Sequence, residues 1–324
     1  MRHVITGGSG FTGTYLALEL ARQGERVLIF DLAPPPASSQ CSCEFVQGDV
    51  RSREDLARIN LLPDDVVYHL AARQFHLAVP KRDQDEWFSD VNVNGTQCVL
   101  DAMESGGATG IVFVSTDMVY GWPQTVPLGT DHRRQPLGPY GRSKLRAEEL
   151  LIAGRRKGLK ATIFRPRLIS GPGRLGILTK LFWLIEHSLP VPLIGTGRNC
   201  YQMVAVEDCV SAMLAAVGKG LPPGPFNLGS DEPPQVRDLL RHLIDRAHSK
   251  SFLVPTWGPG LKATLGLMNK IGMPILHPEQ YLIADAQYVL DTGGTKEALG
   301  WKPKHSDTDM LVGAYEVYRK QGNR

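Results

Sequence analysis

The sequence predicts an α/β fold in which helices cover both faces of a parallel sheet, and three observations support this. Short stretches that are apolar on both faces alternate with helix-like segments through the first half of the chain. A glycine-rich turn joins the first of these stretches to the first helix-like segment. Beyond residue 166 the sequence becomes irregular and richer in proline and glycine. This pattern is typical of a doubly wound sheet followed by a smaller lobe.

The elements follow from this alternation in chain order. The expected strands are HVIT (3–6), RVLIFD (26–31), EFVQGD (44–49), VVYHLAA (66–72), GIVFVST (110–116) and ATIFRP (161–166). The expected helices are 11–23, 52–60, 86–105 and 142–157, and, in the second part, segments near 174–187, 207–217 and 235–247. We expect residues 1–166 to form the sheet domain, joined by parts of 200–230 such as FNLGS, and residues 167–324 to form mainly the lobe.

Composition and charge exclude several classes of protein. The hydrophobic fraction of 42% and the charged fraction of 21% are ordinary for a globular protein. The 36 basic and 33 acidic residues are spread along the chain, without the basic run that would indicate a nucleic-acid or membrane partner. No stretch approaches the ~18 apolar residues of a membrane span, and the N-terminus lacks a signal-peptide pattern. We expect a cytoplasmic protein.

The five cysteines are too few for a disulfide framework in a chain of 324 residues. Cys41 and Cys43 form a Cys-x-Cys pair, but no second Cys or His pair nearby completes a zinc site. The histidines also lack the spacing of metal ligands. The sequence therefore predicts no metal and no thiol mechanism.

The glycine-rich turn is TGGSGFTG, residues 6–13, in which Gly7, Gly10 and Gly13 have the spacing G-x-x-G-x-x-G. Glycine permits a tight turn and lets backbone N–H groups approach a pyrophosphate, whose charge is also favoured by the following helix N-terminus. A purely structural turn is the alternative. Because a strand precedes the turn, a helix follows it and the second strand ends in Asp31, the pattern indicates dinucleotide binding.

Two aspartates at strand ends concern the cofactor. A carboxylate at Asp31 can accept hydrogen bonds from the adenosine ribose but repels the 2'-phosphate of NADP, so the sequence favours NAD. Alternatively, Asp31 only ends the strand. Asp49, in GDV after the third strand, is a candidate to contact adenine or, alternatively, to cap the next helix.

PYGRSK at residues 139–144 places Tyr140 and Lys144 four positions apart, where a loop leads into a helix. Residues i and i+4 share one helix face, so the phenol and the ammonium can serve one site. The spacing is common by chance, and a tyrosine and a lysine that merely share a surface are the alternative. Only the other motifs of the sequence can indicate whether this pair is functional.

Eight stretches occur in order over nearly the whole chain: TGGSGFTG, GDVRS, HLAA, NVNGT, STDMVYG, PYGRSK, FRPRLISGPG and LGWKP. In this order they resemble the extended short-chain dehydrogenase/reductases, also called the NAD-dependent epimerase/dehydratase family. The resemblance implies a Rossmann domain that binds NAD, a C-terminal substrate lobe, and a homodimer paired through the helices at 86–105 and 142–157. The implied cofactor contacts are Gly7, Gly10, Phe11, Thr12, Gly13, Asp31, Asp49, Val50, Leu70, Ala71, Ala72 and Asn92, together with Tyr140 and Lys144.

The resemblance also implies an active site made of a Ser or Thr and the Tyr-x-x-x-Lys pair. Thr116, four residues before Tyr120 of VYG, matches the hydroxyl position. Lys144 and the positive nicotinamide would lower the pKa of Tyr140, normally near ~10. Tyr140 would then take a proton from a substrate hydroxyl while Thr116 hydrogen-bonds the reacting oxygen. Asn92 would order the cofactor region, with a helix-stabilising amide as the alternative.

The residues after Thr116 bear on the reaction. Many dehydratases of the family have an acidic pair directly after the active-site Ser or Thr, but here the residues are Asp117 and Met118, and methionine cannot carry a proton. Asp117 either acts alone or caps a turn, and Asp117 and Met118 are both candidates for substrate contacts. An epimerase needs only oxidation to a ketone and return of the hydride to its opposite face. The sequence therefore favours epimerisation of a sugar, with a nucleotide-sugar dehydratase as an alternative.

Other candidates for substrate contacts depart from the family pattern. Related sugar-nucleotide epimerases usually have an Asn after a Phe in the segment where this chain has Pro166 and Arg167. Tyr201 occupies the place of their pyrophosphate-binding Arg. Arg167 or Arg198 is a candidate to replace that cation, because a guanidinium binds phosphate or carboxylate bidentately, and a surface or structural role is the alternative. By resemblance, the expected substrate is a nucleotide sugar.

Two further functions are open alternatives. The 3β-hydroxysteroid dehydrogenases share the cofactor motifs, and the run LGILTKLFWLIEHSLPVPLIG (175–195) would either line an apolar pocket for such a substrate or build core. A dehydrogenase of this kind accumulates NADH in proportion to product, whereas an epimerase recycles the cofactor. An NAD-sensing regulator on the same fold is the non-enzymatic alternative, although such relatives tend to lack the Tyr140 and Lys144 pair.

Overall fold

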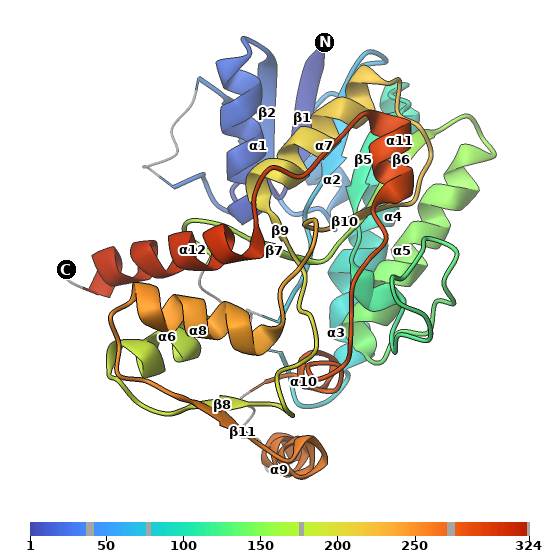
Figure 1. Ribbon diagram of the computed structural model, residues 1–324. Helices are drawn as coiled ribbons and strands as arrows, with labels where there is room; N and C mark the ends of the chain where they lie inside the picture. The colour runs from blue at the N-terminus through green and yellow to red at the C-terminus, as the bar shows by residue number, and fades with distance from the viewer. Residues whose placement is uncertain (37–41, 76–78, 175–177, 271–275, 323–324) are drawn as a thin grey trace.

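A seven-stranded parallel sheet forms the centre of the protein in the computed structural model, which describes residues 1–36, 42–75, 79–174, 178–270 and 276–322 (Figure 1). The strand order is β10-β6-β5-β4-β1-β2-β3, and every neighbouring pair is parallel. The strands are β1 (Arg2–Thr6), β2 (Arg26–Asp31), β3 (Glu44–Gln47), β4 (Val66–His69), β5 (Gly110–Val114), β6 (Lys160–Pro166) and β10 (Phe226–Leu228). The predicted α/β fold is confirmed, and the FNLGS segment does return to the sheet. Cys41 of the Cys-x-Cys pair lies outside the described residues.

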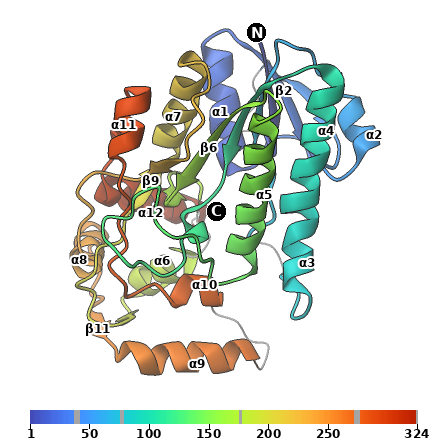
Figure 2. The same cartoon turned by 90° about the vertical axis from the view of Figure 1, so that its right-hand side faces the viewer.

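Helices cover both faces of the sheet (Figure 2) because the side chains of each strand alternate between the faces. They are α1 (Phe11–Arg22) and α7 (Val206–Gly218) on one face, and α2 (Arg53–Ala57), α4 (Thr96–Gly106) and α5 (Pro139–Arg155) on the other. Ile5 and Ile29 belong to the core cluster under α1 and α7. Their neighbours Val4 and Leu28 belong to the cluster on the opposite face. Burial of both faces explains why these strands are continuous apolar runs in the sequence.

Two helical segments differ from their predicted bounds at positions that matter for the site. The segment expected as one helix over 86–105 consists of α3 (Gln84–Ser89), a π-helical segment η2 (Asp90–Gly95) and α4. A π-helical turn widens the helix locally and is frequent at functional sites. The helix expected over 142–157 begins earlier, at Pro139, whose fixed φ suits a first helical position. Tyr140 and Lys144 therefore both lie on α5.

The second part of the chain forms a lobe beneath the sheet in Figure 1. Its helices α6 (Leu178–Glu186), α8 (Val236–Arg246) and α12 (Asp307–Gly322) surround a separate apolar core that includes Phe182, Leu243 and Tyr315. Two small parallel sheets pair β8 (Val191–Leu193) with β11 (Leu253–Pro255), and β7 (Leu168–Ser170) with β9 (Met203–Ala205).

Four further elements belong to the described part of the chain. They are the 3-10 helix η3 (Asp117–Val119) and the helices α9 (Gly258–Lys270), α10 (Pro278–Tyr281) and α11 (Gly293–Leu299). The helix expected near 174–187 is α6, and residues 175–177 before it lie outside the described part. Among the described helices, none combines the length and hydrophobicity that crossing a bilayer requires.

Candidate active site

A cavity of about 1840 Å³ lies between the carboxyl ends of the sheet strands and the lobe. It adjoins β1 and β4, which are neighbours in the sheet although β2 and β3 separate them in sequence. Open α/β sheets bind ligands at such a switch point. All but one of the predicted cofactor contacts line it, namely Gly7, Gly10, Phe11, Thr12, Gly13, Asp31, Asp49, Val50, Leu70, Ala71, Ala72, Tyr140 and Lys144. The exception is Asn92.

The loop between β1 and α1 leaves no room for side chains at two of its glycines. Gly7 has a φ of +72°, and a Cβ atom there would lie 2.5 Å from the backbone nitrogen of Ala71. A Cβ atom at Gly13 would lie 2.4 Å from the carbonyl oxygen of Gly7. Gly10 stands at the N-cap of α1, so no side chain occupies that helix N-terminus. This cradle fits the pyrophosphate of a dinucleotide, which backbone N–H groups at a helix start can bind.

Asp31 ends β2 beside the glycine loop. Its Oδ2 accepts a hydrogen bond from the N–H of Ser9 at 3.0 Å, and its Oδ1 accepts one from the N–H of Leu32 at 2.7 Å. These bonds fix the carboxylate in the cavity wall, at the strand end where this fold binds the adenosine ribose.

Asp49 lies in the loop after β3 and forms an ion pair with Arg51 at 2.6 Å. Hydrogen bonding to Arg51 lowers the pKa of the Asp49 carboxyl. The alternative that Asp49 caps α2 is wrong. Ser52 is the N-cap, and its Oγ accepts a hydrogen bond from the N–H of Asp55 at 3.1 Å.

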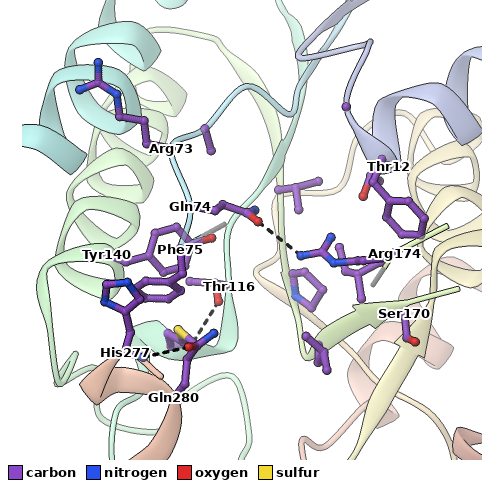
Figure 3. A pocket seen from close by; sticks show the side chains of 18 of the residues that line it. Thr12, Arg73, Gln74, Phe75, Thr116, Tyr140, Ser170, Arg174, His277 and Gln280 are labelled. Carbon is purple, nitrogen blue, oxygen red and sulfur yellow. Dashed lines mark hydrogen bonds between the residues drawn. The ribbon is translucent and has the colours of Figure 1, made fainter. Parts of the chain in front are cut away.

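The three residues predicted to be catalytic line the same cavity as the glycine loop. Thr116 follows β5 and caps η3: its Oγ1 accepts a hydrogen bond from the N–H of Met118 at 3.2 Å and donates one to Oδ1 of Asp117 at 3.2 Å. Tyr140 and Lys144 lie one turn apart on α5. Figure 3 shows Thr116 and Tyr140 on one side of the cavity. The fold thus brings together a hydroxyl from a strand end and a phenol from a helix.

Aromatic rings adjoin both Tyr140 and Lys144. Phe75 and Phe88 meet the Tyr140 ring edge-on, with ring centroids 5.0 and 5.7 Å away. The Nζ of Lys144 lies 4.1 Å from the centroid of the Phe113 ring, a cation–π geometry. Burial lowers the pKa of Lys144 to about 7. This lysine can therefore exchange its proton near neutral pH.

Arg174 and Gln74 are site residues that sequence analysis missed. Burial raises the pKa of Tyr140, and the charge of Glu279 acts in the same direction, whereas Arg174 and Gln74 favour the phenolate. The Nη2 of Arg174 donates a hydrogen bond to the Oε1 of Gln74 at 3.3 Å (Figure 3). Two features of the sequence could have pointed to these residues. Arg174 directly follows the Gly-Pro-Gly of FRPRLISGPG, and Gln74 lies just beyond HLAA. Arg174 thus provides a positive charge that favours the phenolate of Tyr140, a role that the Tyr-x-x-x-Lys pattern had suggested for Lys144.

Asn92 lies behind the residues that line the cavity and forms hydrogen bonds there. Its Oδ1 accepts a hydrogen bond from the N–H of Arg73 at 2.8 Å, and its Nδ2 donates one to the Oγ of Ser143 at 2.9 Å. From η2, the amide thus joins the loop after β4 to the helix of Tyr140. Asn92 therefore links two elements next to the cavity, but it is not among the described residues that line the cavity.

Two of the substrate candidates form a buried ion pair. The Nη1 of Arg167 donates a hydrogen bond to the Oδ2 of Asp117 at 2.6 Å, and the two side chains are 3% and 4% exposed. The rings of Tyr201 and Tyr288 flank the guanidinium, with their centroids 4.7 and 4.3 Å from its Cζ. Arg167, rather than Arg198, therefore lies beside Tyr201.

The lobe contributes a largely aliphatic part of the wall. In the run 175–195, Phe182 and Ile185 build the lobe core. The aliphatic side chains of this run that line the cavity include Leu178, Leu181, Leu193 and Ile194. Met118 also lines the cavity, but Arg198 is exposed and is not among the described lining residues.

A doubly wound sheet with a glycine loop at its switch point defines a dinucleotide-binding α/β protein. The family model described as "NAD dependent epimerase/dehydratase family" matches residues 3–229, and the chain therefore belongs to that family. The UDP-glucose 4-epimerase of Rhizobium leguminosarum bv. trifolii is 33% identical over 352 residues, which cover 98% of this chain and 97% of the relative. The uncharacterized protein y4nG of Sinorhizobium fredii is 34% identical over 325 residues, which cover 99% of this chain and 79% of the relative.

Solved structures of relatives have the same fold over their full length. The UDP-glucose 4-epimerase of Thermotoga maritima with UDP-glucose has a TM-score of 0.78, with 25% identity and 99% of each chain covered. The UDP-glucose-4-epimerase of Stenotrophomonas maltophila, with bound NAD and formylated UDP-arabinopyranose, has a TM-score of 0.79, with 23% identity and coverage of 100% and 99%. The resemblance seen in the sequence motifs is confirmed.

Proposed function

We propose that this protein is an NAD-dependent epimerase that acts on a nucleotide sugar. The proposal is supported by one observation above all: Thr116, Tyr140 and Lys144 line the same cavity as the glycine loop and Asp31. Among relatives, the structure from T. maritima holds UDP-glucose and that from S. maltophila holds NAD. NAD is the proposed cofactor because the Asp31 carboxylate repels the 2'-phosphate of NADP.

In the proposed reaction, the chain's own residues handle the proton and the oxygen. NAD, when bound, supplies the hydride acceptor and donor at the reacting sugar carbon. Tyr140 takes the hydroxyl proton from that carbon's oxygen and returns it at the end. Thr116 donates a hydrogen bond to the same oxygen. To do so, its hydroxyl turns away from Asp117 and toward the substrate. Arg174 favours the phenolate form of Tyr140, and Lys144, one helix turn away, can exchange a proton near neutral pH because burial lowers its pKa to about 7.

The site supports a dehydratase less well, because elimination of water needs a further group that carries a proton. One oxygen of Asp117 is paired with Arg167 and the other accepts the Thr116 hydroxyl. Met118 has no ionisable group. The site therefore lacks the acidic pair that many dehydratases of the family have in this position.

A hydroxyl dehydrogenase with an apolar substrate is the second candidate, and the aliphatic wall of the lobe favours it. Leu178, Leu181 and Leu193 contact the cavity from α6 and β8. Such a surface suits a steroid-like or other apolar alcohol. This candidate uses the same Thr116, Tyr140 and Lys144, so only the net reaction separates it from the epimerase.

The test is a turnover assay on the purified protein with added NAD. UDP-glucose is the first substrate, followed by dTDP-, GDP- and CDP-sugars, with a free steroid alcohol and a simple ketone as controls. An epimerase yields the epimer, detected by NMR, with no net NADH. NADH that accumulates with product supports the dehydrogenase, and loss of water from the sugar supports the dehydratase. Tight NAD binding without turnover of any substrate contradicts the enzymatic proposal and favours the NAD-sensing regulator.

We further propose that the protein is a cytoplasmic homodimer. As the division of the chain we propose residues 1–166 with parts of 200–230 as the NAD-binding domain, and 167–324 mainly as the substrate lobe. The proposed dimer pairs the segments 86–105 and 142–157, whose helices pack together on one face of the sheet (Figure 2). Light scattering measures the mass in solution, and a monomeric mass contradicts the dimer.

A further inference from the structure

A carboxylate from the lobe reaches the first turn of the helix that carries Tyr140. Glu279 of α10 lies 139 positions after Tyr140 in the sequence. Its Oε1 accepts a hydrogen bond from the N–H of Tyr140 at 3.0 Å, and its Oε2 accepts one from the N–H of Gly141 at 2.9 Å. The first N–H groups of a helix have no partner within the helix, and a negative charge there also favours the helix dipole. Glu279 therefore caps α5 from outside that helix.

The start of α5 is suited to this external cap. Gly138, at the N-cap position, has no side chain to accept these hydrogen bonds. Pro139 has no N–H group, so the first N–H groups that need a partner are those bonded to Glu279. A Cβ atom at Gly138 would lie 2.4 Å from the Cγ of Glu279, and one at Gly141 would lie 3.2 Å from its Oε2. The two glycines leave the space that the Glu279 side chain fills.

The same short helix also reaches the ring of Tyr140. His277, the residue before α10, stacks on Phe75 with ring centroids 4.8 Å apart and planes at 30°. Phe75 in turn meets the Tyr140 ring edge-on at 5.0 Å. Figure 3 shows His277, Phe75 and Tyr140 together on one side of the cavity. We name Phe75, His277 and Glu279 the Tyr140 clamp, because they hold its ring and its backbone.

The Tyr140 clamp is in contact with the space where a substrate would bind. Phe75, His277 and Gln280 line the cavity. Glu279 is 4% exposed and faces the helix start instead. A ligand that contacts α10 in the cavity therefore touches the same helix whose Glu279 is hydrogen-bonded to the backbone of Tyr140.

We propose that Glu279 is a positioning residue, through which the lobe sets the position of Tyr140 and a substrate bound against α10 orders the catalytic helix. This inference rests on the proposed function of Tyr140 as the group that transfers the proton. The alternative is that Glu279 only stabilises the fold, since two hydrogen bonds to a buried carboxylate also join the lobe to the sheet. The two roles differ in their effect on kcat in a folded protein that still binds NAD.

The test compares Glu279→Ala, Glu279→Gln and Glu279→Asp with the control Glu297→Gln, which makes the same chemical change at an exposed position of α11. The measurements are NAD affinity, thermal unfolding, kcat and KM with UDP-glucose, and hydrogen exchange at the amides of Tyr140 and Gly141. In Glu279→Ala we expect faster exchange at both amides and a kcat lower by about 10- to 100-fold, because small displacements of a reacting group cost this much. NAD affinity is expected to stay unchanged. Glu279→Gln keeps one acceptor oxygen and is expected to lie between Glu279→Ala and the wild type, whereas the shorter Glu279→Asp is expected to resemble Glu279→Ala.

A lower melting temperature with unchanged kcat overturns the positioning role and leaves a structural one. Should Glu279→Ala not fold, Glu279→Gln and Phe75→Leu test the two arms of the Tyr140 clamp separately. If the wild type turns over no substrate, the proposed function fails. Hydrogen exchange with NAD alone then still tests the cap on which the inference depends, because equal exchange at Tyr140 and Gly141 in the wild type and in Glu279→Gln contradicts the cap and with it the positioning role.

Discussion

The guanidinium of Arg167 lies 2.6 Å from the carboxylate of Asp117, in a buried pair directly beside Thr116. Two residues that sequence analysis treated as separate substrate candidates thus neutralise each other. The pair is flanked by Tyr201 and Tyr288, whose rings face the guanidinium. The carboxylate next to Thr116 is therefore paired within the protein rather than left free for a substrate.

Breaking this pair should destabilise the protein strongly. Arg167→Met leaves a buried carboxylate without its cation, and the free energy of unfolding is expected to fall by about 3–5 kcal/mol. The double variant Asp117→Asn/Arg167→Met should recover part of this loss, because neither charge is then left alone. Denaturant unfolding of the single and double variants measures the coupling. Strictly additive effects contradict the pairing.

Tyr140→Phe removes one hydroxyl and keeps the ring that packs on Phe75 and Phe88. Because Tyr140 is proposed to carry the proton, kcat should fall by about 100-fold or more. NAD affinity and the melting temperature should change little. Tyr315→Phe, which alters a buried tyrosine in the lobe core, is the matched control and should keep full activity. Retained activity in Tyr140→Phe contradicts the assignment.

Asp31→Ala tests the cofactor preference. Removal of the carboxylate takes away acceptors for the ribose hydroxyls and the repulsion of the 2'-phosphate. We expect the ratio of NAD affinity to NADP affinity to fall by about 10-fold or more, which corresponds to ~1.4 kcal/mol. Ser9 and Leu32 also lose a hydrogen-bond acceptor, so the ratio is the quantity to measure rather than either affinity alone. An unchanged ratio shows that Asp31 only ends the strand.

Gly13→Ala should disturb the cofactor loop. The new Cβ would lie 2.4 Å from the carbonyl oxygen of Gly7, so the backbone must move, at a cost of roughly 1–3 kcal/mol of unfolding free energy. NAD affinity should fall as well. Gly218→Ala is the control, because that glycine ends α7 and its Cβ would meet no atom within 4 Å. Similar losses of NAD affinity in both variants would argue against the loop as the binding site.

The stability of the protein should depend on the ionisation of Glu279. Burial raises the pKa of Glu279 to about 6, from an ordinary value of 4.5. The folded state therefore binds the carboxyl proton of Glu279 more tightly than the unfolded state does. The stabilisation of the folded state by this proton is fully present below pH 4.5 and is lost as the pH rises through 6. Arg142 lowers this pKa and Asp85 raises it, and these two residues form an ion pair of their own at 2.7 Å.

Glu279→Gln isolates this contribution. Relative to the variant, the wild type should lose about 2 kcal/mol of unfolding free energy as the pH rises from well below 4.5 to well above 6. Denaturant unfolding across this range gives the difference between the two proteins. A difference that does not change with pH contradicts the raised pKa.

The sequence by itself determined which segments form the sheet strands, which segments form the flanking helices, and where the glycine loop lies. These features depend on local physics: alternation along a strand, the conformational freedom of glycine, and the shared face of residues four apart in a helix. The four-residue spacing could therefore bring Tyr140 and Lys144 to one site, although the predicted helix began only at 142, and Asp31 could be placed at a strand end, before any contact was known. The glycine loop and the strand-end carboxylate of the cavity wall follow from such local patterns, whereas the strand order that brings them together is a property of the structure.

Only the tertiary structure decided which distant side chains meet. Arg167 and Arg198 were equivalent candidates in the sequence, yet one is buried against Asp117 and the other is exposed. Glu279 reaches Tyr140 across 139 positions of sequence, and Arg174 reaches Gln74 across 100. Such contacts depend on how the lobe folds back over the ends of the strands, and no periodicity or short motif specifies that packing.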